Sequence, residues 1–168
     1  MKLDWKGRGD GMIAEKVLKE CRVFSTLTGA ELEKIASLAI EKQFEAGTVI
    51  LEGKDFTEEL IIVEDGKVAL QMELPTSQPQ TSRRTTVDLV TRYEMLGWPV
   101  TFGPFDYSFT AVCLTKTAVL AINGMKLRQM LRDNPHLEHE ILSGFIKVLA
   151  SRLYDTFQVL ISERLLAY

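Results

Sequence analysis

The hydrophobic residues of this chain repeat at helical spacing near both ends and at strand spacing in the middle. Residues 11–21 place five apolar side chains on one helical face: Ile13, Ala14, Val17, Leu18 and Cys21. Thr28 and Glu31 then have the T-x-x-E spacing of a capping box, which predicts a second amphipathic helix with Leu32, Ile35, Ala36 and Leu38 on its apolar face. The chain therefore begins with two short helices.

Strand patterns take over after Ile40. Gly47 predicts a turn ahead of the β-branched run at residues 48–50. In "ELIIVEDGKVALQMEL", residues 60–63 predict one strand and the alternation over residues 68–74 predicts another. Asp65-Gly66 between them accepts the positive φ angles of a two-residue turn, so the segment is interpreted as a β-hairpin.

The second half of the chain returns from strands to helices. A polar Pro/Ser/Thr/Gln loop is expected at residues 75–84, with Arg83 and Arg84 solvated in it. Strand patterns at 85–98, 107–114 and 117–123 bring the expected strands to about eight. Asn123 is a candidate cap for a short helix, and Asn134-Pro135 starts a long one that only Gly144 interrupts before about residue 166. That helix would be ~46 Å long.

This order of elements predicts the fold class. Strands grouped between helices, without strand–helix alternation, indicate an α+β fold built on an antiparallel β-roll or jelly roll rather than a parallel sheet. No internal repeat is found, and a single domain of residues 1–168 is expected. Within it, residues 20–133 would form the helix-plus-roll core and residues 134–168 the long C-terminal helix.

The long helix carries two apolar stripes. One contains Leu137, Ile141, Phe145, Val148 and Ile161 and is expected to cover the core of the domain. The other is spaced almost as a heptad seam and consists of Leu142, Ile146, Leu149, Leu153, Phe157 and Leu160. Because a monomer would leave that second stripe exposed, a homodimer formed through the helix is expected. The alternative is a helix folded back entirely onto its own roll.

Composition and charge exclude several function classes. With 46% hydrophobic residues and a net charge of −3, the chain has an ordinary globular composition and no overall attraction to nucleic acid or anionic lipid. It has no apolar run of membrane-spanning length and no signal-peptide pattern, so a cytoplasmic location without membrane contact is expected. Cys21 and Cys113 have no metal-site spacing and are interpreted as free buried thiols.

Candidate chemistry is sparse. His136 and His139 could chelate a metal from one helical face, but no third ligand is evident, so both are interpreted as surface residues and no cofactor or metal is expected. The sequence has no GxSxG, HExxH or P-loop motif, which argues against an enzyme.

Taken in order, several segments resemble the cyclic nucleotide-binding domains of Crp/Fnr regulators, kinase regulatory subunits and gated channels. These are "RVFSTLTGAELEKIASLA", "FEAGTVILEGKDFTEELIIVEDGKVAL", "TAVLAINGMKLRQML" and the long helix, which is similar to the dimer helix of the family. The resemblance implies a non-enzymatic, ligand-sensing β-roll. Crp/Fnr regulators continue past this helix into a DNA-binding domain, whereas this chain stops at Tyr168, so direct DNA binding is not expected.

The phosphate cassette of the family departs from its pattern here. Family members carry F-G-E-[LIVM]-[AS], a loop and R-[ST]-A, where backbone amides and the Arg hold the cyclic phosphate and the Glu holds the ribose. The aligned residues, which form the candidate ligand site, are Leu96, Gly97, Trp98, Pro99, Val100, Tyr107, Ser108, Phe109 and Thr110. Trp98 replaces the Glu, and Tyr107 or Ser108 replaces the Arg. The Gly-Trp form is similar to stand-alone bacterial members of the family whose ligand the sequence does not reveal.

These replacements predict that cAMP and cGMP bind weakly or not at all. Trp98 could fill the vacated pocket, or it could form one wall of a pocket for a flatter or less charged ligand. On the long helix, Thr156 matches a family position that reaches the purine, which makes it a further candidate ligand residue. Two hypotheses remain: a dimeric ligand-sensing domain, and a dimeric module that binds a partner protein and has a non-functional pocket.

Overall fold

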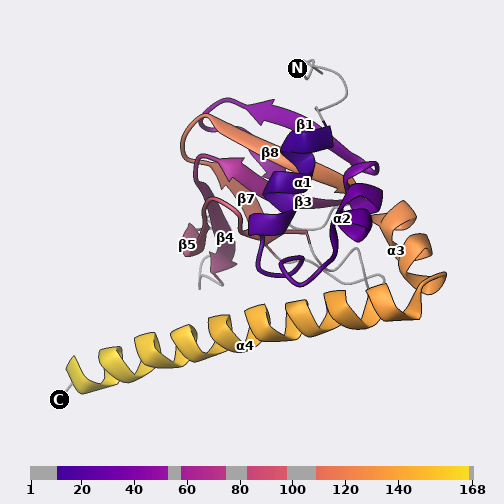
Figure 1. The fold of residues 1–168 in the computed structure, drawn as a ribbon. Coiled ribbons are helices and arrows are strands. Elements are labelled where there is room, and N and C mark those ends of the chain that lie inside the picture. Colours follow the sequence, from indigo (N-terminus) through magenta and orange to yellow (C-terminus); the bar gives the residue numbers. More distant parts are fainter. Residues whose placement is uncertain (1–10, 53–57, 75–82, 98–108, 167–168) are drawn as a thin grey trace.

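The computed structural model describes residues 11–52, 58–74, 83–97 and 109–166. Its helices are α1 (Gly11–Glu20), α2 (Gly29–Ala36), α3 (Gly124–Arg132) and α4 (Pro135–Leu166). Its strands are β1 (Ala39–Phe44), β2 (Val49–Leu51), β3 (Glu59–Asp65), β4 (Val68–Leu74), β5 (Arg83–Val90), β6 (Met95–Leu96), β7 (Thr110–Cys113) and β8 (Thr117–Asn123). The strands form one body, and α4 runs along it and projects past it (Figure 1).

Two antiparallel four-stranded sheets make up this body, with strand orders β1-β8-β3-β6 and β2-β7-β4-β5. Strand β8 lies inside the first sheet, where it pairs with β1 from Ala39↔Ile122 to Phe44↔Thr117 and with β3 on its other side. The expected α+β fold, an antiparallel roll with short N-terminal helices and a long C-terminal helix, is confirmed.

The expected β-hairpin of β3 and β4 is wrong, although its turn is correctly placed. Strand β3 pairs with β6 and β8 in the first sheet, whereas β4 pairs with β5 and β7 in the second. Gly66 has φ 102°, and a Cβ there would lie 2.7 Å from the Lys116 carbonyl oxygen. The turn therefore carries the chain from one sheet to the other beside the β7–β8 connection.

The reason lies in the uninterrupted apolar run of β3, because both faces of this strand are buried. Leu60 and Ile62 belong to a core cluster that β3 shares with the helices, while Ile61 and Val63 belong to a second cluster inside the roll. A hairpin open to solvent on one face would leave half of these side chains in water. Burial on both faces instead requires β3 to form the wall between two cores.

The helix caps agree with the sequence predictions. The Thr28 hydroxyl accepts from the Glu31 backbone amide, and the Glu31 carboxylate accepts from the Thr28 amide, which completes the predicted capping box. Asn123 caps α3 by accepting from the Lys126 amide at 2.9 Å. Asn134 likewise accepts from the Leu137 amide at the start of α4.

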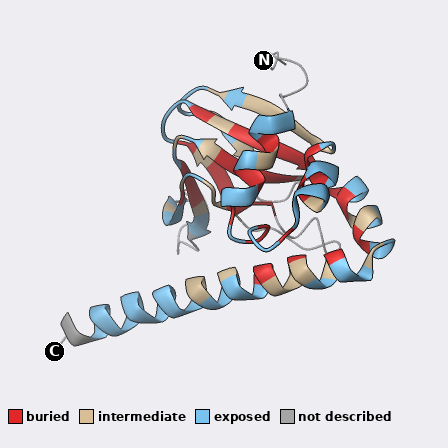
Figure 2. Cartoon of the chain, in the orientation of Figure 1, coloured by how far each residue is buried: buried red, intermediate tan, exposed pale blue. Residues whose placement is uncertain are grey.

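The first half of α4 packs on the helical core, and the second half does not. Leu137, Ile141 and Phe145 are buried in the cluster beneath α1 and α2. Every residue of 153–164 is exposed, as Figure 2 shows by the change of colour along the helix. The alternative of a helix folded back entirely onto its roll is therefore wrong for this half.

Two smaller expectations also need correction. Arg83 and Arg84 are not in a loop but in β5, and Arg84 has ion pairs of 3.6 Å to Glu52 and Glu73. Ile161 was placed on the core stripe of α4, but it is 51% exposed. The reason is that Ile161 lies in the half of α4 that projects past the body, where every residue of 153–164 is exposed. Neither change alters the topology.

Candidate functional site

The described ends of the candidate cassette belong to different sheets. Leu96 ends β6 opposite Ile61 in the first sheet, and the described chain resumes at Phe109, just before β7 enters the second sheet. Leu96 is fully buried in the inner cluster of the roll, and Phe109 packs against the same cluster. The ends of the cassette segment therefore share one apolar interior.

Gly97 follows Leu96 with φ 77°, a backbone conformation that favours glycine. It is buried at the point where the chain leaves the first sheet. At the other end, Thr110 is buried opposite Gln71 of β4. The remaining predicted cassette residues, Trp98, Pro99, Val100, Tyr107 and Ser108, lie outside the described residues.

Thr156 lies in the exposed half of α4. Its hydroxyl donates to the Arg152 carbonyl oxygen of its own helix at 2.8 Å, the usual local bond of a helical threonine. In the single chain, Thr156 is therefore turned to solvent rather than packed against Leu96 or Phe109.

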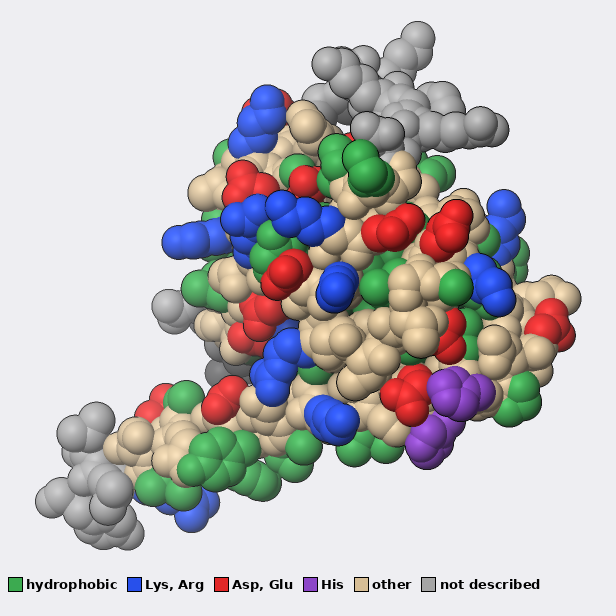
Figure 3. All heavy atoms as spheres, in the orientation of Figure 1, with side chains coloured by type: hydrophobic (Ala, Val, Ile, Leu, Met, Phe, Trp, Pro, Cys, Tyr) green, Lys and Arg blue, Asp and Glu red, His purple; other side chains and the backbone are tan. Residues whose placement is uncertain are grey.

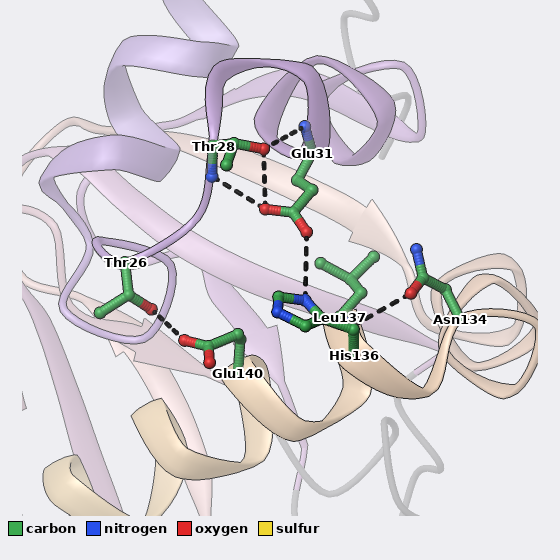
Figure 4. Close-up of polar contacts among 7 residues, drawn as sticks. All are labelled: Thr26, Thr28, Glu31, Asn134, His136, Leu137 and Glu140. Atoms are coloured by element: carbon green, nitrogen blue, oxygen red, sulfur yellow. Dashed lines mark hydrogen bonds and ion pairs between the residues drawn. The ribbon is translucent and has the colours of Figure 1, made fainter.

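A polar network fixes the start of α4 against the segment before α2 (Figure 4). The Thr26 hydroxyl donates to Glu140 at 3.0 Å, and His136 Nδ1 lies 3.6 Å from the Glu31 carboxylate. Hydrogen bonds from the Thr28 amide and hydroxyl lower the pKa of Glu31, with a smaller contribution from His136. The capping box of α2 thus also positions α4.

A close backbone contact lies one to two turns further along α4. A Cβ at Gly144 would overlap the Val23 carbonyl oxygen and lie 2.9 Å from the Val23 Cα. Glycine at this position lets the helix axis approach the segment between α1 and α2. The sequence did carry a signal for this contact, because Gly144 is the only glycine of α4.

Beyond Gly144, a hollow of about 90 Å³ separates α4 from the body. Its walls come from residues 21–23, from residues 93–95 after β5, and from α4 between Val148 and Asp155. Tyr93 in the wall has φ 65°, which is strained for a non-glycine residue. Sequence reasoning missed this hollow, because residues far apart in the chain form it.

The described residues provide little for metal or thiol chemistry. Within the described ranges, no group of three or more His, Cys, Asp or Glu side chains is placed to hold a metal ion. Both cysteines are free and buried, as the sequence predicted. Burial raises the pKa of Cys21 to about 11, so its thiol is a poor nucleophile near neutral pH. None of the helices in the described ranges is both long and apolar enough to cross a bilayer.

Comparison with known proteins gives a consistent result. The model of the family described as "Cyclic nucleotide-binding domain" matches residues 41–134, more than half of the chain. Curated proteins provide no match.

Solved structures provide three informative matches. A candidate cyclic nucleotide-binding protein from Geobacter metallireducens is 26% identical, with a TM-score of 0.70 over 83% of this chain and 98% of that one. A cyclic nucleotide-binding domain from Methylobacillus flagellatus has a TM-score of 0.75 at 15% identity, covering 91% of this chain and 83% of that one. The Thermus thermophilus catabolite activator protein has a TM-score of 0.66 at 22% identity, covering 83% and 61%.

Proposed function

Because the chain belongs to the cyclic nucleotide-binding domain family, we propose that it senses a small molecule at the cassette between β6 and β7 and transmits binding through α4. The arrangement of Leu96 and Phe109 supports this. Both contact the inner cluster of the roll, although Leu96 ends β6 in the first sheet and Phe109 directly precedes β7 in the second. A ligand held by the intervening segment would contact both sheets.

The ligand we propose is less anionic than a cyclic nucleotide. Residues 97–110 contain one charged side chain, the anionic Asp106, and no Arg or Lys. Enclosing a cyclic phosphate without a cation costs several kcal/mol, which backbone amides alone offset only in part. We therefore expect cAMP and cGMP not to bind in the manner usual for the family. Trp98 would instead form an aromatic wall for a flatter, less charged molecule.

Calorimetry with matched ligands tests the charge argument. We expect no micromolar binding of cAMP or cGMP to the unaltered chain. The double variant Trp98→Glu/Ser108→Arg restores the carboxylate and the guanidinium, and it should gain at least about tenfold in cAMP affinity. Adenosine, which keeps the ribose but lacks the phosphate, should gain less than cAMP. Micromolar binding of cAMP to the unaltered chain, lost in Trp98→Ala, would refute the proposal.

We also propose that two copies associate through the seam of α4. Ile146, Leu149 and Leu153 are 65%, 40% and 55% exposed. Figure 3 shows hydrophobic side chains gathered where α4 runs past the body. A heptad-like stripe is self-complementary, so a second copy can bury it. In sedimentation experiments, Leu153→Glu should yield monomers, whereas Ser162→Glu on the opposite helical face should not. A monomeric unaltered chain would refute this part.

The alternative function is a dimeric interaction module whose pocket is filled by Trp98. The exposed seam favours it, since dimerisation through that surface requires no ligand. Thermal-shift screening distinguishes the two functions, because a ligand at a hundred times its Kd stabilises the fold by about 2.7 kcal/mol. The filled pocket would be favoured if nucleosides, nucleotides and small aromatic acids left Tm unchanged and if Trp98→Ala were less stable than the unaltered chain.

A further inference from the structure

The described lining of the hollow between α4 and the body includes none of the predicted cassette residues. Its interior includes three buried residues, Cys21, Val23 and Met95. Its polar lining comes from Arg22, Glu94, Ser151, Arg152 and Asp155. We propose that this hollow is a second binding site, for a small zwitterion of the amino-acid type. The inference does not rest on the cassette or on its ligand.

Two of the four charged side chains already have partners. Arg152 Nη1 lies 3.5 Å from Asp88 Oδ2 on β5. Glu94 Oε2 accepts from the Thr91 amide at 2.7 Å and from the Thr91 hydroxyl at 2.9 Å. These contacts fix α4 and the turn after β5. They also leave the Arg152 guanidinium and the Glu94 carboxylate with less capacity to pair with a ligand.

The other two charges are opposite in sign and come from different elements of the fold. Arg22 lies in the segment after α1, and Asp155 lies on α4. Within the described ranges, neither forms an ion pair with another residue. A ligand with a carboxylate and an ammonium group can pair with both. A simple anion would pair with Arg22 but be repelled by the Asp155 carboxylate. A simple cation would pair with Asp155 but be repelled by Arg22.

The size of the hollow limits the ligand. A cavity needs about 10–15 Å³ of water-accessible space to hold one water molecule, so about 90 Å³ accommodates roughly six or more non-hydrogen atoms. Glycine and alanine are the zwitterions of this size. The Ser151 hydroxyl, one helical turn before Asp155, adds a hydrogen-bonding group to the α4 wall.

The wall formed by Tyr93 provides an independent observation. Its left-handed backbone is held by a 2.7 Å bond from its amide to the Val63 carbonyl oxygen, and the Arg92 guanidinium lies 4.8 Å from its ring centroid. Strained residues of this kind persist where the surroundings fix them, and they concentrate at binding sites. A ligand in this hollow would join the segment after α1, the Tyr93 turn and α4, and so hold the helix against the body.

Calorimetry at low salt with glycine and L-alanine tests the proposal, with acetate and methylammonium as single-charge controls. Glycine should bind with a Kd of about 1 mM or tighter, which is reasonable for a ligand of five non-hydrogen atoms. Arg22→Gln and Asp155→Asn should each weaken binding by about tenfold. Arg132→Gln and Glu163→Gln remove one exposed charge of each sign elsewhere and should not weaken it.

A charge exchange separates recognition from a structural effect. A zwitterion can reverse its orientation, so Arg22→Asp/Asp155→Arg should recover glycine binding that each single exchange abolishes. Trp98→Ala should leave glycine binding unchanged. This result would show that glycine does not bind at the cassette. The proposal is overturned by no heat from glycine or alanine at about 10 mM, by acetate binding as tightly as glycine, or by equal affinity in both neutral variants.

Discussion

Replacing Gly144 with alanine tests whether α4 is seated on the backbone of Val23. Judged by helix propensity alone, Gly144→Ala should stabilise the protein by about 1 kcal/mol. The added Cβ, however, would overlap the Val23 carbonyl oxygen and lie 2.9 Å from the Val23 Cα, where ordinary contacts begin at 3.4 Å. Both Val23 atoms belong to the backbone, so α4 or the segment after α1 must move.

Overpacking of this kind costs roughly 1–3 kcal/mol, and a clash with backbone lies at the upper end of that range. After subtraction of the propensity gain, Gly144→Ala should lower the free energy of unfolding by about 2 kcal/mol. For a domain of this size, that lowers Tm by about 4–8 °C. Urea unfolding followed by circular dichroism provides the free energy, and a thermal scan provides Tm.

Ala150→Gly is the matched control, because Ala150 lies on the exposed side of the same helix. It should cost about 1 kcal/mol through propensity alone. The contact with Val23 would be refuted if Gly144→Ala proved as stable as the unaltered chain or more stable.

Further predictions concern caps, turns and thiols. Thr28→Ala should cost about 1 kcal/mol near neutral pH. Because Thr28 lowers the pKa of Glu31 below its ordinary 4.5, that contribution is present above pH 4.5 and is lost as pH falls through the folded pKa. The difference in unfolding free energy between the unaltered chain and Thr28→Ala should therefore become smaller in acid. A difference that does not change with pH would contradict the capping role of Thr28. Gly66→Ala should destabilise more than Gly47→Ala in urea titrations, because both have positive φ but only Gly66 meets neighbouring backbone. Cys21 should react with a thiol reagent at pH 8 only as the protein opens, at a rate that rises with urea; rapid labelling of the folded chain would disprove its burial.

The sequence was sufficient wherever neighbouring residues determine the structure. The Thr28–Glu31 box and the Asn123 cap depend on hydrogen bonds between residues three apart, and both are confirmed. The partners of β3 and β4 could not be predicted in this way. A turn signal at Gly66 fixes the reversal of the chain, but which strands pair depends on two cores assembled from the whole domain.

The candidate sites also differ in whether local sequence signals or tertiary packing determine them. Leu96 and Phe109 were predicted from their position in a family pattern, and the structure places both beside one inner cluster. The role of the cassette remains a prediction. The hollow beside Tyr93 has no local signature, because the left-handed backbone of a tyrosine and the approach of α4 to Val23 arise only from tertiary packing.

The close contact at Gly144 holds α4 against the body near the N-terminal end of the helix, so rotation about this contact would move the free C-terminal end. From Gly144 to Arg164 the helix extends about 30 Å at 1.5 Å per residue. A tilt of about 10° at this contact would carry the tip through roughly 5 Å, the length of one helical turn. Sub-ångström adjustments in the body would thus become displacements that a neighbouring molecule can detect.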